Sequence, residues 1–213
     1  MHNVVQRDDP NMSQATPLPL RERKKRDTRR RICDVASHLF VEDGFDSTTV
    51  EAIASESHIS KPTFFNYFAS KQQVLSELMT RMDEEFVRYI GHAVQEGRST
   101  RERLSILMKQ SAEHIERHPK LTRLLLVEGM SDLGDPNVDT SRMARLNGAM
   151  SILVETGREQ GDISTGFSTA LQVQILVGGY LYGLLNWLSG TAQPLRSALQ
   201  ETAEFLAEAL APR

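Results

Sequence analysis

Apolar residues recur with a helical period along most of the chain, and no stretch alternates apolar and polar residues for long. This pattern favours helices over strands because side chains of one helix face recur every three to four residues. The clearest example is one face made of Ile32, Val35, Ala36, Leu39 and Phe40. With 213 residues available for a core, the sequence predicts an all-α fold of one or two domains.

Two short helices are predicted after the first helix, which should stop near Asp43-Gly44. Thr48 and Glu51 have the spacing of a capping box, and their helix is expected to end around Ser57-His58. Ser60 suits the N-cap of the next helix, and a proline two residues later suits its first turn. Short helices joined by so tight a turn predict a helix-turn-helix.

The second of these helices carries aromatic residues for a core and polar residues for a surface. Phe64, Phe65 and Phe68 are predicted to anchor it to the first helix. In a helix-turn-helix the leading residues of the second helix meet base edges in the major groove, where hydroxyl, amide and ammonium groups form hydrogen bonds. The predicted base-reading residues are Ser60, Lys61, Thr63 and Asn66, and Pro62 beside them is also predicted at the DNA-binding surface.

Basic residues flank this motif. Eight residues between Arg21 and Arg31 are Arg or Lys, although the whole chain has a net charge of −3. The uneven charge indicates an anionic partner at one end, with a solvated helix start as the alternative. Arg29, Arg30 and Lys71 are therefore predicted to contact DNA.

Six further helices follow in the pattern, which gives about nine in total. Their expected ranges are 71 to beyond 90, 100–118, 119–129, 139–160, 169–188 and 195–211, with a loop at 131–139. The chain is expected to divide into a flexible arm at 1–20, a helix-turn-helix domain at 21–72 and a C-terminal helical domain at 73–213.

The segment 169–188 contains no charged residue and is mostly apolar. Its length approaches the ~20 residues that span a bilayer. Gln172, Gln174 and Asn186 favour a buried helix, and no Lys or Arg stands beside either end to anchor a span. A buried helix is the preferred interpretation, and a membrane span is the alternative.

The stretch from Thr28 to Leu75 resembles the DNA-binding domain of tetracycline-repressor-type (TetR-like) regulators. The resemblance depends on a helix ending in "LF" before a glycine, then "TTV" and "IA", then "IS", "YF" and "SK". It implies an all-helical homodimer that represses transcription at a palindromic operator. It also implies a C-terminal domain that dimerises and binds an unknown small-molecule effector.

The resemblance implies phosphate contacts by Thr48 or Thr49, Tyr67 and Lys71. Two positions depart from the family pattern. His58 stands where the family usually has glycine in the turn, and would take a left-handed conformation at some cost. Phe65 stands where the family often has a tyrosine that touches DNA, and it lacks the hydroxyl.

The resemblance also implies that the last two helices form a four-helix dimer interface. In this interpretation glycines of the uncharged helix allow close approach and leucines fill the seam. Burial within one subunit is the alternative. The predicted interface residues are Gly179, Gly183, Leu181, Leu184 and Leu188.

Effector-binding candidates are polar or aromatic residues within otherwise apolar helices: His114, Arg123, Glu128, Tyr180 and Trp187. His114 and His118 have no third ligand fixed by spacing, so no metal is expected. No phosphate loop, nucleophile elbow or convincing carboxylate pair is present, so neither an enzyme nor a cofactor is predicted. The single Cys33 and the absence of an apolar N-terminal signal segment fit a cytoplasmic protein.

One further hypothesis stays open at this point. The chain can also be a small-molecule-binding or protein-interaction module whose helix-turn-helix is only scaffold and binds DNA without sequence preference.

Overall fold

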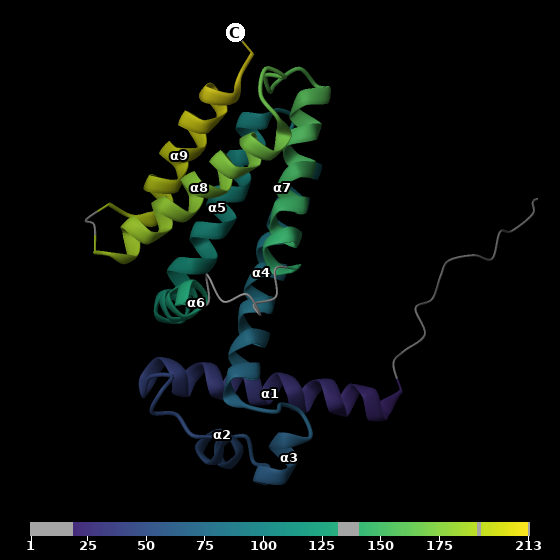
Figure 1. The fold of residues 1–213 in the computed structure, drawn as a ribbon, viewed down its shortest axis with the longest axis vertical. Coiled ribbons are helices and arrows are strands. Elements are labelled where there is room, and N and C mark those ends of the chain that lie inside the picture. The colour runs from purple at the N-terminus through teal and green to yellow at the C-terminus, as the bar shows by residue number, and fades with distance from the viewer. Residues whose placement is uncertain (1–18, 132–140, 191–192, 213) are drawn as a thin grey trace, which may run out of the picture.

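A computed structural model describes residues 19–131, 141–190 and 193–212. Within these ranges every regular element is a helix, which confirms the all-α prediction. The predicted loop lies outside the described residues except for Ser131, which ends α6, and so does nearly all of the predicted N-terminal arm. The helices, labelled in Figure 1, are α1 (Leu20–Glu42), α2 (Val50–Glu56), α3 (Lys61–Phe65), α4 (Lys71–Glu96), α5 (Thr100–Arg117), α6 (Pro119–Ser131), α7 (Ser141–Glu159), α8 (Thr169–Leu188) and α9 (Leu195–Leu210).

Helix starts are set by side chains that accept hydrogen bonds from otherwise unpaired backbone N–H groups. The hydroxyls of Thr49, Ser60, Ser70, Ser99 and Ser168 each accept one from the residue three positions later. These caps are local in sequence, and four of the five are serines directly before a helix. The predicted starts of α3, α4 and α8 are confirmed at these residues.

The predicted cap of α2 is corrected by one residue. Thr49 caps the helix, while the Thr48 hydroxyl donates to the Gly44 carbonyl oxygen at 2.8 Å. Thr48 is buried, with only 3% of its surface exposed. The sequence contains two adjacent threonines with equal capping ability, and only the path of the chain after Gly44, where φ is +87°, selects the second.

The molecule has two hydrophobic cores joined by α4. The lower core in Figure 1 gathers α1, α2, α3 and the first turns of α4. The upper core gathers the rest of α4 with α5, α7, α8 and α9. Helix α6 also contributes to the lower core, since Leu125 is buried there and Leu121 and Leu124 pack against it. Helices α4 and α6 therefore both connect the body to the helix-turn-helix.

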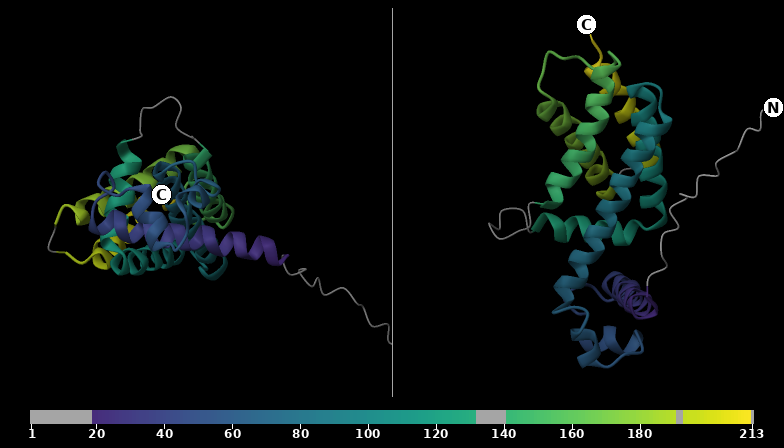
Figure 2. Two further views of the ribbon diagram at one scale, coloured as in Figure 1. Left: turned by 90° about the horizontal axis from the view of Figure 1, so that it is seen from below. Right: turned by 90° about the vertical axis from the view of Figure 1, so that its right-hand side faces the viewer.

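In the upper core α5 packs against α9 and α4, while α8 packs between α7 and α9. The perpendicular views in Figure 2 show this bundle standing on one side of α1, with α2 and α3 on the other side. The helix-turn-helix is consequently left at one end of an elongated molecule, with α3 uncovered by the body.

Two of the three glycines of α8, Gly179 and Gly183, face the neighbouring helix α9. A Cβ atom added at Gly179 would lie 3.2 Å from a Leu206 methyl, and one at Gly183 would lie 3.3 Å from a Leu199 methyl. Both glycines therefore permit close packing inside the subunit, as the alternative interpretation held, rather than forming the outer seam. Leu184 is likewise buried in the upper core.

Helix α8 remains free of charged residues along its whole length. None of the helices in the described ranges is both long and apolar enough to cross a membrane. The preferred interpretation of residues 169–188 as a packed helix agrees with this finding.

Candidate nucleic-acid interface

The turn between α2 and α3 is built on a left-handed residue. His58 has a φ of +54°, and in the described part of the chain it is the one residue other than glycine with positive φ. Its backbone N–H donates to Ser55 at 3.0 Å, and that of Ile59 donates to Ala54 at 3.0 Å. The predicted left-handed conformation at His58 is confirmed, and the turn reverses the chain within four residues.

Helix α3 is held by two phenylalanines that are almost completely buried. Phe64 is 0% exposed and Phe68 is 1% exposed, with 6.0 Å between the centres of their rings. The Arg29 guanidinium lies 4.1 Å from the centre of the Phe68 ring. These contacts fix the orientation of a helix of only five residues, which would not be stable by itself.

Arg29 is committed to contacts within the fold. Its guanidinium donates to the Tyr67 carbonyl oxygen at 2.7 Å and to the Glu77 carboxylate at 2.9 Å. The hydrogen bond from Arg29 lowers the pKa of Glu77 from its usual value. The predicted DNA contact by Arg29 is thus replaced by a tie between α1, the end of the helix-turn-helix and α4, whereas Arg30 stays exposed.

The leading end of α3 presents polar groups to solvent. Ser60, Lys61, Pro62 and Asn66 are exposed, while Thr63 is half-buried and shares a 2.7 Å hydrogen bond with the Ser60 hydroxyl. Lys61 forms an ion pair with Glu51 of α2, and this hydrogen bond lowers the pKa of the Glu51 carboxyl group. The structure therefore brings the four predicted base-reading residues and Pro62 together on one small surface.

Phe65 differs from its predicted role. It is 46% exposed and lies beside Phe64 in an edge-to-face contact with 5.6 Å between ring centres. Adjacent residues on a helix point about 100° apart, and in this short helix Phe64 points into the core while Phe65 points toward solvent. Phe65 therefore adds an apolar group to the exposed face of α3, where it suits a thymine methyl or a sugar.

Lys71 also differs from its predicted role as a phosphate ligand. Its ammonium nitrogen donates to the backbone carbonyls of Phe45, Asp46 and Thr48 at 2.7, 2.9 and 3.1 Å. It also lies 4.6 Å from the centre of the Phe45 ring. A lysine has three donors, and all three are used here. Lys71 thus fastens the loop between α1 and α2 to the start of α4.

Two further predicted phosphate contacts have different surroundings. Thr49 is exposed at the start of α2, where its hydroxyl caps the helix. Tyr67 is half-buried and packs against the lower core. Thr48 is buried, so of the two threonines only Thr49 is available to a phosphate.

The predicted effector residues fall into two groups around α5, α6 and α8. Tyr180 is buried, stacks on Phe86 with 4.7 Å between ring centres, and shares a 2.6 Å hydrogen bond with Ser111. Burial raises the pKa of Tyr180 to about 12. His114 is half-buried near Tyr89, and its pKa is lowered, first by burial and then by His118.

The second group lies at the ends of α6 and α8. Trp187 packs against the upper core, and Arg123 is exposed, with its guanidinium 3.4 Å from the Leu188 carbonyl oxygen. Glu128 is half-buried near the end of α6. No group of three or more residues suited to a metal ion exists in the part of the chain that the structure describes.

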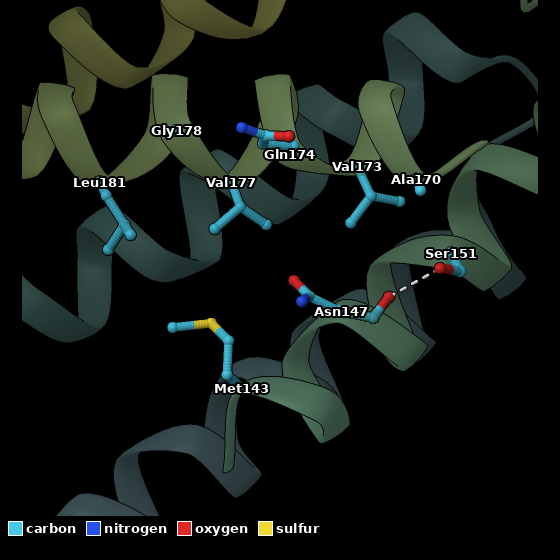
Figure 3. Close-up of a pocket in the computed structure, with 9 residues that line it drawn as sticks. All are labelled: Met143, Asn147, Ser151, Ala170, Val173, Gln174, Val177, Gly178 and Leu181. Carbon is cyan, nitrogen blue, oxygen red and sulfur yellow. Dashed lines mark hydrogen bonds between the residues drawn. The ribbon is translucent and has the colours of Figure 1, made fainter. Parts of the chain in front are cut away.

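A groove of about 510 Å³ lies between α7 and α8 (Figure 3). Val173, Val177 and Leu181 of α8 point toward α7, from which Met143 and Asn147 face them. The other lining residues are Ser151, Ala170, Gln174 and Gly178. Nothing charged lines the groove, and among the predicted effector residues none belongs to it. Leu181, predicted at the dimer seam, lines this groove.

Comparison with known proteins matches the helix-turn-helix to a described family. The sequence model for "Bacterial regulatory proteins, tetR family" matches residues 32–78, from the buried part of α1 into α4. Residues 32–78 are therefore a DNA-binding domain of the TetR type. This match confirms the resemblance seen in the sequence, and it covers the segment in which α2 and α3 are held by Phe64, Phe68 and Lys71.

Relatives of this chain fall into partial and nearly full-length matches. The regulator TcmR of Streptomyces glaucescens is 41% identical over 68 residues, which are 32% of this chain and 30% of TcmR. Thermus thermophilus FadR, a TetR-family transcriptional repressor solved with lauroyl-CoA, is 28% identical, with a TM-score of 0.63 over 87% of this chain and 96% of that chain. Bacillus subtilis FadR, solved with stearoyl-CoA, has the same fold at 18% identity, with a TM-score of 0.71 over 85% of this chain and 98% of that chain.

Proposed function

We propose that this chain is a ligand-responsive TetR-family transcriptional repressor that binds a palindromic operator as a homodimer. The observation that carries the proposal is the exposed leading turn of α3, held rigidly by Phe64 and Phe68 at an uncovered end of the molecule. A rigid, polar helix end of this kind fits the major groove of duplex DNA.

The proposed DNA contacts follow from exposure and chemistry. Ser60, Lys61, Thr63 and Asn66 offer donors and acceptors for base edges, and Pro62 lies beside them. Thr49, Tyr67 and Arg30 would contact the backbone on either side, where they would fix the position of the protein without reading sequence. Lys61 would exchange its ion pair with Glu51 for a phosphate or a guanine.

The proposed dimer uses the outer face of α8 and α9. Tyr182 is 73% exposed and Phe205 is 70% exposed, which is unusual for large side chains on a monomeric surface. Gly178 lies on the same side of α8, with open space where its Cβ atom would be, and permits close approach of a second subunit. The remaining large exposed apolar residues of α8 are Leu171, Ile175 and Leu185.

The groove between α7 and α8 is the proposed effector site. Its apolar floor and the amides of Asn147 and Gln174 suit an uncharged or long-chain molecule, and its volume lies within the usual range for ligand sites. The two FadR structures were solved with fatty acyl-CoA ligands, so lauroyl-CoA is a suitable first probe. A ligand that shifts α7 or α8 can reach the helix-turn-helix through α4 and α6, since both helices belong to the lower core.

The proposal also includes the three-part division of the chain. Residues 21–72 would bind DNA, residues 73–213 would dimerise and bind the effector, and residues 1–20 would form an arm in a cytoplasmic protein. The lower core continues along α4 as far as Leu78 and Met79, so the boundary at residue 72 marks a change of function within one continuous helix.

Selection from a randomised duplex library tests the proposal. The wild-type chain is expected to enrich a palindromic sequence, and lauroyl-CoA or a related apolar ligand to release it. Asn66→Ala should change the preferred bases in each half-site, whereas Gln95→Ala, an exposed substitution on α4, should leave them unchanged. A library that yields no enriched sequence would instead support the alternative of a helical module with non-specific DNA binding.

A further inference from the structure

The first half of α1 is a helix that stands clear of the rest of the protein. Helix α1 begins at Leu20, twelve residues before Ile32, its first buried residue. At 1.5 Å per residue these residues extend for about 18 Å. Figure 1 shows this end of α1 running past α3, and the view from below in Figure 2 shows it projecting beyond the body. We call residues 20–31 the α1 extension.

The α1 extension is strongly basic. It holds eight Arg or Lys residues and only Glu22 and Asp27 as acidic residues, a net charge of +6. Because the whole chain has a net charge of −3, the remaining residues carry −9. The positive charge is therefore concentrated at the end of the molecule that carries α3.

Most of these cations have no partner inside the protein. Seven of the eight are exposed, and within the described residues their side chains form neither a hydrogen bond nor an ion pair; the exception is Arg29. Arg21 and Lys25, like Arg26 and Arg30, lie four residues apart, where like charges destabilise a helix. Cations near a helix N-terminus also oppose the helix dipole. An anion lying along the extension would relieve both effects.

The extension lies outside the part of the chain that defines the family. The match to the family begins at Ile32, where the buried face of α1 also begins. Apart from Arg29, which contacts Tyr67, Phe68 and Glu77, packing of the helix-turn-helix thus does not require the residues of the α1 extension to be basic. Their charge needs a separate explanation.

We infer that the α1 extension binds the phosphate backbone next to the half-site that α3 reads, and so lengthens the operator. This inference rests on the proposed function. About 18 Å of helix matches roughly five base-pair steps at 3.4 Å each, so the contacts reach DNA beyond the bases under α3. The extension contributes affinity without reading sequence, since phosphates are the same at every step.

Four substitutions to glutamine test the inference. Glutamine has a helix propensity close to that of Arg and Lys, so the variant keeps its helix while losing charge. The control variant loses the same charge on the body of the protein. The extension variant carries Arg21→Gln, Arg23→Gln, Lys24→Gln and Lys25→Gln, and the control carries Arg98→Gln, Lys109→Gln, Arg117→Gln and Lys120→Gln.

Both variants are titrated against the duplex that the wild-type chain selects, over a range of salt concentrations. For the extension variant, the slope of log affinity against log salt concentration should become less steep by at least about 2. Each lost phosphate contact contributes about 0.9 to this slope, and a dimer has two extensions. The control should retain the wild-type slope. Wild type should also bind more tightly when the duplex is lengthened beyond the half-sites, and the extension variant should lose that preference.

Two outcomes overturn different statements. Equal slopes and equal dependence on duplex length for the extension variant and its control overturn the role of the α1 extension, while sequence-specific binding stands. Failure of the wild-type chain to select any sequence overturns the proposed function, and the inference falls with it.

Discussion

Lys71 offers a sharp test because the structure gives it a role different from the one its position suggests. A lysine at the first position of α4 opposes the helix dipole, so it needs compensating partners. It finds them in three backbone carbonyls and the ring of Phe45. Lys71→Met retains most of the aliphatic stem and removes the three hydrogen bonds and the charge.

The expected loss can be worked out from these contacts. The site is half-exposed, so each hydrogen bond contributes toward the lower end of the usual range, about 0.5–1 kcal/mol, and the freed carbonyls can hydrate. The contact with Phe45 adds about 0.5 kcal/mol. We expect Lys71→Met to lower the free energy of unfolding by about 2–3.5 kcal/mol, or the melting temperature by about 4–14 °C for a chain of this size.

Urea unfolding followed by circular dichroism measures the free energy of unfolding. DNA titration at several salt concentrations measures the slope of log affinity against log salt concentration. Lys109→Met, an exposed change on α5, is the control and should alter neither quantity. DNA affinity of Lys71→Met should fall because the loop between α1 and α2 loosens, but the salt slope should stay at the wild-type value. A slope that flattens by about 1.8, one phosphate contact per subunit, with stability unchanged, would refute the structural role of Lys71.

Three further predictions concern other parts of the chain. His58→Gly should stabilise the protein by about 1 kcal/mol in urea unfolding because glycine takes the left-handed conformation without strain, whereas His38→Gly on α1 should destabilise it by about 0.3–0.5 kcal/mol. Tyr182→Arg should shift the protein from dimer to monomer in light scattering, while Ile152→Arg, exposed on α7, should not; a dimer in both variants would contradict the proposed interface. Burial raises the pKa of the Cys33 thiol from 9.0 to about 11, so the free energy of unfolding should fall as pH rises from 9 to 11, where only the unfolded thiol ionises. A thiol reagent at pH 8 should label Cys33 only in denaturant, and rapid labelling of the folded protein would contradict the burial of Cys33.

The helices and the helix-turn-helix could be predicted because their signals are local. A serine before a helix supplies its own cap, and the ends of α2 and α8 agree with the prediction to the residue or nearly so. The left-handed turn at His58 was expected from the resemblance, because the family usually has glycine at this position. These features need only a few consecutive residues, whatever the rest of the chain does.

The candidate DNA-binding and effector sites were predictable only in part. The exposed end of α3 follows from helical period and from the motif, and Ser60, Lys61 and Asn66 are where the sequence placed them. The groove between α7 and α8 was missed, because its lining residues are ordinary apolar and amide side chains on two separate helices. No pattern within one helix marks such a site.

The sequence by itself determined the helices, their caps and the basic start of α1, since charge and hydrogen bonding among near neighbours decide all three. Tertiary structure decided what each side chain meets. Gly179 and Gly183 face α9, and Lys71 binds carbonyls more than twenty residues earlier in the chain. Those pairings depend on how the helices pack, and packing is fixed by many distant contacts at once rather than by the spacing of residues along the chain.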